Sequence, residues 1–342
     1  MNFQENFSLK KYNTFGIEAM AKYFATFKNV AELGECVEFV KSSALSSKPA
    51  VLILGGGSNI LFTKNYDGVV LKNEIAGIQQ VDEDEDFVYI KAGAGESWHQ
   101  LVLYCVKQNL GGVENLSLIP GSVGASPMQN IGAYGVETKD VFHSLEAYHL
   151  QEQKIVNFGI ADCEFGYRES VFKGKYKNEF VITNVTFRLN KNPLVNTSYG
   201  AITQELDRMG VSTPTIQNVS QAIINIRQGK LPDPARIGNA GSFFKNPEIA
   251  NAAFLKLQEK FPAIIGYDLR NGKTKLAAGW LIEKCGWKGY REGDAGCNDK
   301  QSLVLVNFGT ATGDEIFALS DKIIRSVKER FGVELVREVN VV

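Results

Sequence analysis

The chain has 342 residues, of which 44% are hydrophobic and 22% are charged, and its formal net charge at pH 7 is −1. This length is enough for two or three domains, and the composition is that of an ordinary globular protein. A chain so close to neutral has no excess of basic residues for binding nucleic acid or an anionic membrane surface.

The cysteines and histidines give no sign of a disulfide framework or a metal centre. The five cysteines are an odd number without any C-x-x-C pair, and the three histidines are scattered. This usage is typical of a reducing cytosol, so we expect a cytoplasmic protein without a metal. We expect no signal peptide, because residues 1–20 contain no apolar h-region. We also expect no membrane insertion, because no segment reaches the roughly 18 apolar residues of a membrane helix.

The first 70 residues predict a turn, a helix and a strand that ends in a glycine loop. Residues 12–16 form a turn-like signature, and Asn29 can cap a helix whose apolar residues follow helical spacing over 30–40. The strand 51–54 runs into Gly-Gly-Gly-Ser-Asn at 55–59, a common design for a phosphate cradle. The loop is neither a P-loop nor a Rossmann fingerprint, and a tight hairpin turn is an equally good interpretation.

Residues 68–190 are rich in strands. The apolar patterns predict strands at 68–72, 87–92, 143–150 and 180–189 and a helix at 98–108. Strands and helices do not alternate regularly, which predicts an α+β fold rather than a parallel α/β sheet.

The stretch 115–136 contains no charged residue, but it holds four glycines and two prolines. This composition excludes a helix interior, a central strand and a membrane span. It favours a folded loop whose bare backbone approaches a ligand, since free N–H groups can bind a diphosphate without a cationic side chain. An ordinary long surface loop is the alternative, although long loops without structure are usually functional.

The rest of the chain predicts a helical region, a break and a second folded region. Residues 196–229 give a loop and two helices, and Leu-Pro-Asp-Pro at 231–234 places a domain boundary near residue 232. A glycine loop at 238–247 is not the G-x-S-x-G elbow of a serine hydrolase. Beyond it the patterns predict helices at 250–260, 276–285 and 314–331, a strand at 303–307 and a strand-like end at 333–342.

Three glycine loops therefore stand in order at 55–59, 120–135 and 238–247, with Tyr-Arg-Glu at 167–169 and Arg-Glu-Val at 337–339. Together these motifs resemble the UDP-N-acetylenolpyruvoylglucosamine reductases of bacterial peptidoglycan synthesis, over essentially the whole chain. Leu-Pro-Asp-Pro followed by Gly-Asn-Ala-Gly-Ser-Phe-Phe-Lys-Asn-Pro is among the most specific pieces.

The resemblance implies an α+β fold with a two-part FAD-binding unit of the vanillyl-alcohol-oxidase (PCMH) type and a smaller α/β C-terminal substrate domain. The first FAD-binding subdomain would comprise residues 1–70 with the returning segment 332–342. The second would comprise 71–232, and the substrate domain 233–331.

The resemblance also implies that FAD is bound non-covalently by the glycine loops, which agrees with the charge-free cradles read from the residues. The implied FAD-binding residues are Asn13, Thr14, Gly55, Gly56, Gly57, Ser58, Asn59, Ile119, Pro120, Gly121, Ser122, Gly124, Ala125, Asn130, Gly132, Ala133, Tyr134 and Gly135.

The implied reaction is the NADPH-dependent reduction of the enolpyruvyl ether of UDP-N-acetylglucosamine to UDP-N-acetylmuramate. Hydride addition puts charge into an enediolate, so a cation must stabilise that charge and an acid must protonate carbon. The family implies Arg168 and Glu338 around the substrate carboxylate and Ser242 as the proton donor. From the residues alone, Arg168 is a solvated surface arginine, Ser242 a turn hydroxyl, and Glu334 is as good a candidate as Glu338.

The resemblance also implies a set of substrate-binding residues, which are Tyr167, Tyr199, Lys230, Asn246 and Gln301. The loop that contains Tyr199 is similar to the tyrosine loop of the type I subclass. Lys230 can equally be a surface lysine. Family members often have Arg two residues after the catalytic glutamate, whereas this chain has Asn340. We expect a monomer whose partner is the small-molecule substrate.

Two other functions fit parts of the sequence. One is an alcohol or sugar oxidase of the same fold, many of which attach FAD through a histidine; the only histidine near a matching glycine segment is His99, in the predicted helix 98–108. The other is a catalytically silent nucleotide-sugar binding protein, which is expected to lack Arg168, Ser242 or Glu338.

Overall fold

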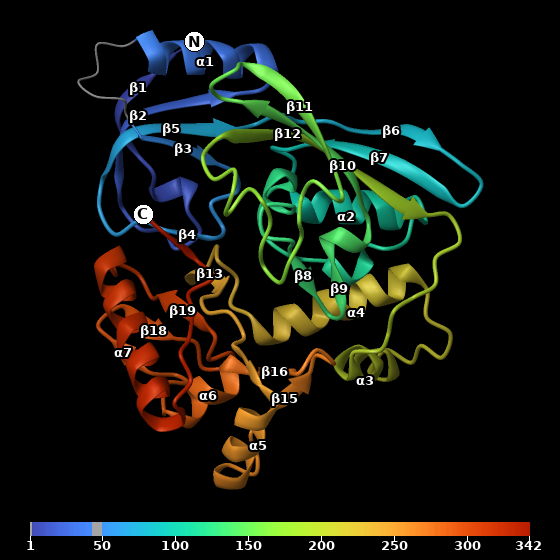
Figure 1. The fold of residues 1–342 in the computed structure, drawn as a ribbon, viewed down its shortest axis with the longest axis vertical. Coiled ribbons are helices and arrows are strands. Elements are labelled where there is room, and N and C mark those ends of the chain that lie inside the picture. The colour runs from blue at the N-terminus through green and yellow to red at the C-terminus, as the bar shows by residue number, and fades with distance from the viewer. Residues whose placement is uncertain (1, 43–49) are drawn as a thin grey trace. The chain divides into compact units, whose positions relative to one another are not determined.

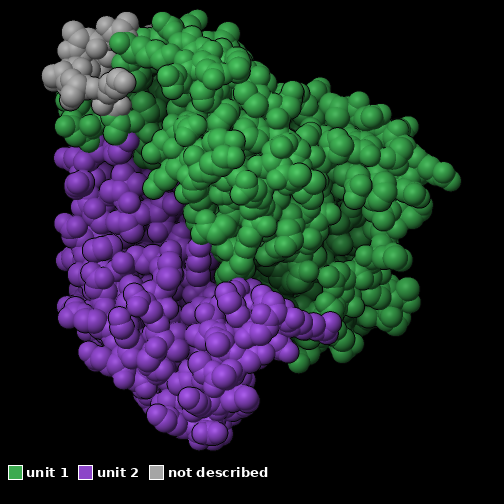
Figure 2. Space-filling view, viewed as in Figure 1, with its two compact units in different colours: residues 1–7, 21–56, 67–229 green, residues 8–20, 57–66, 230–342 purple. Residues whose placement is uncertain are grey.

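The computed structural model, drawn in Figure 1, describes residues 2–42 and 50–342. The chain divides into two units, which Figure 2 shows in different colours. Unit 1 comprises residues 1–7, 21–56 and 67–229, and unit 2 comprises residues 8–20, 57–66 and 230–342. The division falls between Gly56 and Gly57, so the 55–59 loop contributes to both units. The three-part division at residues 70 and 232 stays a prediction.

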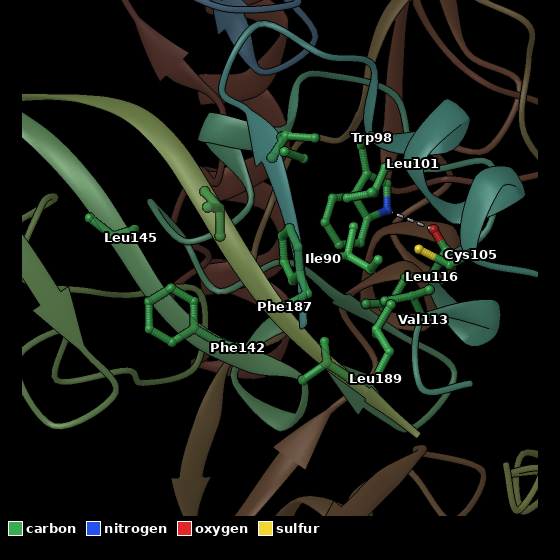
Figure 3. Packing of buried hydrophobic residues seen from close by; sticks show 14 of the residues in the cluster. Ile90, Trp98, Leu101, Cys105, Val113, Leu116, Phe142, Leu145, Phe187 and Leu189 are labelled. Atoms are coloured by element: carbon green, nitrogen blue, oxygen red, sulfur yellow. Dashed lines mark hydrogen bonds between the residues drawn. The ribbon is translucent and has the colours of Figure 1, made fainter. Parts of the chain in front are cut away.

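A five-stranded antiparallel sheet forms the centre of unit 1, with helix α2 (Trp98–Lys107) beside it (Figure 1). The Trp98 ring lies edge-on to Phe187, with the ring centroids 5.6 Å apart, and both side chains are buried with Leu101 (Figure 3). Burying side chains of this size contributes about 1.5–3 kcal/mol each. The strands run in the order β11 (Lys154–Gly159), β10 (Phe142–His149), β12 (Phe180–Asn190), β7 (Phe87–Gly93) and β6 (Ile78–Glu83).

A second sheet of unit 1 carries the first part of the glycine loop. Its strands run in the order β1 (Gln4–Ser8), β2 (Met20–Phe27), β5 (Tyr66–Asn73) and β3 (Ala50–Leu54), and helix α1 (Val30–Ser42) connects β2 to β3 along the chain. Strand β3 pairs with β5 in parallel. Strand β4 (Ile60–Leu61), beyond the glycine loop, pairs instead with β20 (Asn340–Val341). The hairpin interpretation of 55–59 is therefore wrong, because the strands on either side of the loop do not pair with each other.

Helices α3 (Gly200–Arg208) and α4 (Ile216–Lys230) share a small apolar cluster in unit 1. Val219, Ile223 and Ile226 of α4 lie in this cluster, as their helical spacing predicts. The cluster also packs against Tyr134 at the end of the 115–136 stretch. The two helices therefore lie against one of the candidate loops.

Unit 2 is built around a sheet with helix α7 (Gly313–Phe331) packed beside it (Figure 1). Thr312 and Glu315 form a capping box at the start of α7, and Gly332 ends it with a φ of +67°. The sheet has the order β13 (Gly238–Ser242), β19 (Val304–Asn307), β18 (Ala295–Cys297) and β17 (Arg291–Glu292). A smaller sheet of β14 (Glu248–Ala250), β16 (Lys273–Leu276) and β15 (Gly266–Asp268) is accompanied by α5 (Asn251–Lys260) and α6 (Ala278–Lys284).

Two predicted segments differ from the structure. Residues 238–242 form strand β13 rather than a loop, because they pair with β19. The glycines are accommodated by a register shift between Asn239 and Ser242, where Gly241 adopts a φ of +69°. The end at 333–342 forms a strand only at Asn340–Val341. Its alternation of apolar and polar residues reports alternate burial, with Leu335 buried and Glu334 exposed, rather than continuous pairing.

Among residues 2–42 and 50–342, no helix is long and apolar enough to cross a membrane. No group of three or more His, Cys, Asp or Glu side chains in those ranges is arranged to hold a metal ion.

Candidate active site

The 115–136 loop belongs to unit 1 and is tied to its core. It begins within a 3-10 turn at Glu114–Leu116 and contains a second one at Val123–Ala125. It ends in a short hairpin of β8 (Gly132–Ala133) and β9 (Val136–Glu137). The Trp98 indole donates a hydrogen bond to the Leu116 carbonyl at 2.9 Å, and the Gly124 amide donates to Ala94 at 2.9 Å. The loop is therefore fixed at several points along its length.

Within unit 1, the first glycines of the 55–59 loop lie directly on the 115–136 loop. A Cβ added to Gly56 would stand 2.8 Å from Gly121 Cα, and one added to Gly55 would stand 2.3 Å from Ser122 Oγ. Neither distance leaves room for a larger residue. The two loops therefore pack directly on each other, and the glycines permit this close approach.

The two loops carry polar groups that fit FAD. Asn115 Oδ1 and Ser126 Oγ are buried and have no hydrogen-bond partner among the described residues. Such buried atoms cost free energy unless a ligand or water satisfies them. Lys72 donates its ammonium to the Gly55 carbonyl at 2.8 Å, and burial lowers the pKa of this ammonium. A backbone cradle with a cation at its edge fits a diphosphate.

The sequence patterns did not identify Lys72, Asn115 or Ser126 as site residues. The available signal for Lys72 is a lysine directly after the apolar run Val69-Val70-Leu71 of β5. For Asn115 and Ser126 the only sequence signal is that they lie in a stretch without charge. A buried polar atom without a hydrogen-bond partner can be recognised only when the surrounding structure is known.

Arg168 lies in a tight turn of unit 1 and contacts the 115–136 loop. Its guanidinium donates to the Gly132 carbonyl at 2.5 Å and to the Asn130 carbonyl at 3.4 Å, and it lies 5.3 Å from the centroid of the Tyr167 ring. The Asn130 side chain in turn donates to Gly166 at 3.0 Å. Arg168 is therefore partly buried and oriented by the loop, which differs from a solvated surface arginine.

Tyr199 also lies in unit 1 and packs on the 115–136 loop. Its ring meets the Tyr134 ring edge-on, with the centroids 5.3 Å apart, while 46% of the residue stays exposed. The Asn115 amide donates to the carbonyls of both Tyr134 and Asn196 at 3.0 Å. The predicted tyrosine loop is thus joined to the predicted FAD loop.

Ser242 and Glu338 come together in unit 2. The Glu338 amide donates to the carbonyl of Phe243 at 2.8 Å, which places Glu338 beside the end of β13 that carries Ser242. Phe243 is fully buried, so this strand end is anchored. Ser242 is exposed, and its hydroxyl forms no hydrogen bond with the described residues. This differs from a turn hydroxyl that satisfies its own loop.

Glu334 lies elsewhere in unit 2. It is exposed and pairs with Lys328 near the end of α7, with the carboxylate oxygen 3.2 Å from the ammonium nitrogen. The structure therefore distinguishes the two glutamates that composition leaves equivalent, and only Glu338 lies beside the strand of Ser242.

Among the predicted FAD-binding residues of unit 2, the Thr14 amide donates to the Gly57 carbonyl at 3.0 Å, and the Asn59 side chain donates to the Glu338 carbonyl at 3.4 Å. The Asn13 amide group is occupied within its own turn, since its Nδ2 donates to Leu9 and to Ile17 at 2.9 Å. A contact from Asn13 to a cofactor would therefore come from its backbone.

Three predicted substrate-binding residues differ in their contacts with the rest of unit 2. Asn246 Oδ1 accepts the Ala278 amide at 3.0 Å, at the start of α6, so part of this side chain has a capping role. Gln301 Oε1 accepts the Leu303 amide at 3.4 Å. Lys230 is exposed at the end of α4 and forms no ion pair within the described ranges.

Comparison with known proteins gives matches along the whole chain. The family described as "UDP-N-acetylenolpyruvoylglucosamine reductase, C-terminal domain" matches residues 233–342, and "FAD binding domain" matches residues 21–159. The chain is 48% identical to the UDP-N-acetylenolpyruvoylglucosamine reductase of Flavobacterium johnsoniae over 343 residues, covering 100% of both. The enzyme of the same name from Amoebophilus asiaticus is 49% identical over 342 residues, again covering 100% of both.

The chain belongs to the UDP-N-acetylenolpyruvoylglucosamine reductases. It is therefore a flavoprotein oxidoreductase with FAD as its cofactor, as its FAD-binding domain also indicates. The crystal structure of the reductase from Thermus caldophilus has a TM-score of 0.65 at 23% identity, covering 99% of this chain and 98% of that one. This similarity supports the fold: the α+β architecture of an FAD-binding unit with a C-terminal domain is confirmed.

Proposed function

We propose that this chain uses NADPH to reduce the enolpyruvyl ether of UDP-N-acetylglucosamine to UDP-N-acetylmuramate, a step of peptidoglycan precursor synthesis. Membership of the reductase family supports this substrate. The observation that carries the proposal is the position of Glu338 beside the strand end that presents the unpartnered hydroxyl of Ser242. A proton donor held in a fixed place is what the second half of this reaction needs.

The chemistry assigns a task to Arg168. FAD, when bound, would take a hydride from NADPH and supply it to the methylene carbon of the substrate. The electron pair of the alkene then moves towards the substrate carboxylate, giving an enediolate. The Arg168 guanidinium, which stays charged at neutral pH, would stabilise this charge, and such stabilisation is usually the largest catalytic contribution. Its bonds to Gly132 and Asn130 support this role, because a preorganised cation does not have to reorient.

Ser242 would then protonate the carbon next to the carboxylate. A serine hydroxyl is a weak acid in water, but here its target is a strongly basic carbanion, and a bound substrate would displace water from around the hydroxyl. The exposed, unpartnered hydroxyl supports the assignment, since a proton donor must be able to reach its substrate. Glu338 would contact the enolic form of the substrate carboxylate.

The binding assignments follow the two units. In unit 1 the surface made by the 55–56 and 119–135 backbones would hold FAD, and Tyr167 and Tyr199 would contact the substrate. In unit 2 Thr14, the 57–59 backbone and the backbone of Asn13 would contact FAD. Lys230, Asn246 and Gln301 would bind the diphosphate or the sugar.

We also propose a monomer in the cytoplasm. All five cysteines are free thiols, and burial raises the pKa of Cys105 and Cys297 to about 12, so neither is a reactive thiolate. Free thiols are typical of a reducing compartment.

The visible absorbance spectrum of the purified protein tests the proposal. We expect flavin bands that bleach under anaerobic NADPH and return when enolpyruvyl-UDP-N-acetylglucosamine is added. If the flavin bands bleach but do not return, the protein is a flavin reductase and the proposed substrate is wrong. A colourless protein that also fails to take up added FAD would overturn the assignment of the glycine loops.

A further inference from the structure

Arg227, on helix α4 of unit 1, lies against the 115–136 loop. Its Nε donates to the carbonyl of Leu118 at 3.1 Å, and the hydroxyl of Tyr134 is close enough that each group shifts the pKa of the other. Leu118 and Tyr134 have φ values of +57° and +51°. A non-glycine residue in this left-handed region is strained and persists only where its surroundings hold it.

The charge of Arg227 has no counter-ion in the protein. In the part of the chain that the structure describes, no carboxylate pairs with it, although the side chain is partly buried. Burial lowers the pKa of the guanidinium, which nevertheless stays protonated at neutral pH. Nearby, His99 Nδ1 accepts the Leu118 amide at 2.9 Å, and burial together with Arg227 lowers the pKa of this imidazole, which keeps it neutral. The bond to Leu118 is therefore made by a cation, and hydrogen bonds with an ionised partner are stronger than neutral ones.

Helix α4 provides a rigid support for these bonds. Ile223 and Ile226 bury one face of the helix in the cluster shared with α3. Ser220 precedes Arg227 on the same helix, and its Oγ lies 2.8 Å from Ser117 Oγ. The helix therefore contacts the start of the loop at both Ser117 and Leu118. A packed helix, rather than another loop, therefore fixes the position of the 115–136 loop.

Tyr134 extends this arrangement to the tyrosine loop. Its ring packs edge-on against Tyr199, and its carbonyl shares the Asn115 amide with Asn196. A Cβ on Gly135 would lie 3.6 Å from the Asn196 side chain, which is ordinary contact. Any shift of Tyr134 would therefore move the surface on which Tyr199 rests.

We propose that Arg227 is a positioning residue that bridges helix α4 and Leu118, holds the 115–136 loop in its FAD-binding form and so keeps Tyr134 in place under Tyr199 for the substrate. This inference rests on the proposed function, in which that loop binds FAD and Tyr199 contacts the substrate. Arg227 itself acts through the groups it holds and takes no part in the chemistry.

Two substitutions of Arg227 separate bridging from charge. Arg227→Gln removes the charge, whereas Arg227→Lys keeps it but lacks the planar guanidinium whose Nε bonds to Leu118. Each purified variant is stripped of FAD and titrated with FAD, with flavin fluorescence as the readout. We expect the FAD dissociation constant to rise on the order of tenfold or more in both variants. Wild-type affinity in Arg227→Lys would overturn the bridging role. Arg208→Lys, on exposed α3, is the matched control and is expected to bind FAD like the wild type.

A double-mutant cycle with Tyr134→Phe keeps the proposal testable if the Arg227 variants lose stability. This change removes only the hydroxyl, whose pKa burial raises and the nearby Arg227 lowers, and keeps the ring on Tyr199. We expect weaker FAD binding, a raised KM for the UDP-sugar substrate, and an effect of the double variant smaller than the product of the single effects. Strictly multiplicative effects would overturn the proposal. The FAD titrations do not need turnover, so they test Arg227 even if the proposed substrate proves wrong.

Discussion

The backbone amide of Glu338 donates to the carbonyl of Phe243, the residue directly after Ser242, at 2.8 Å. The Lys245 amide donates to Val336 at 2.8 Å on the other side, so the two segments run antiparallel around a bridge between Phe244 and Arg337. Arg337 is itself held by Asp321 and Ser320 of α7. The register of the C-terminal segment is therefore fixed in unit 2, and the register brings Glu338 to the strand of Ser242.

Removing the Ser242 hydroxyl is expected to separate the two half-reactions. In Ser242→Ala, NADPH should still bleach the flavin at the wild-type rate, because the hydroxyl takes no part in that step. Reoxidation by the enolpyruvyl substrate should slow by roughly 10²–10⁴, the usual contribution of a positioned acid. Anaerobic stopped-flow absorbance measures both rates. If both slowed equally, Ser242 would not be the proton donor.

The two glutamates of the C-terminal segment should behave differently. Glu338→Gln keeps the size of the side chain but replaces the carboxyl group with an amide that cannot give up a proton, and we expect reoxidation by substrate to slow by roughly 10² or more. Glu334→Gln is the matched control. It loses only an exposed pair with Lys328, worth about 0–1 kcal/mol of stability, and turnover should be unchanged. Equal effects on turnover would show that the register of this segment does not select Glu338.

A methyl group on Gly56 should disturb the contact between the two loops of unit 1. In Gly56→Ala the new Cβ would stand 2.8 Å from Gly121 Cα, and we expect a loss of about 1–3 kcal/mol in the free energy of unfolding. The protein should also be purified with less FAD. Gly174→Ala is the control, because nothing lies within 4 Å of its Cβ, and it should be neutral or stabilising by up to about 1 kcal/mol. Thermal unfolding and the flavin-to-protein absorbance ratio report the two effects.

Glu114, at the start of the 115–136 loop, should make stability depend on pH. The residue is buried and accepts the Gly112 amide at 2.6 Å, and burial raises the pKa of its carboxyl. The folded state therefore binds the proton more tightly than the unfolded state, so stability falls as pH rises from the ordinary glutamate pKa through the raised one. Glutamine cannot ionise, so the difference in Tm between Glu114→Gln and the wild type should grow in favour of the variant from pH 4 to pH 8. A difference that stays constant with pH would contradict this assignment.

The sequence alone determined the elements whose signals are local. The helical spacing of 98–108 and of 314–331 gave α2 and α7 within about two residues, because side chains one turn apart share a face whatever lies opposite. The charge-free stretch 115–136 and the glycines at 55–59 indicated bare-backbone loops for the same reason, since backbone freedom belongs to the residue itself. The motifs in this order also identified the family.

Only the tertiary structure decided which side chains meet. It distinguished Glu338 from Glu334, turned Arg168 from a surface arginine into a group oriented by Gly132, and brought Arg227 to Leu118 and Tyr134. It also left 333–337 without a continuous strand, although the residues alternate as in one. These contacts join segments far apart in the chain, and their free energy depends on register and burial. Neither quantity is a property of a local stretch of sequence, so no periodicity or composition could have fixed them.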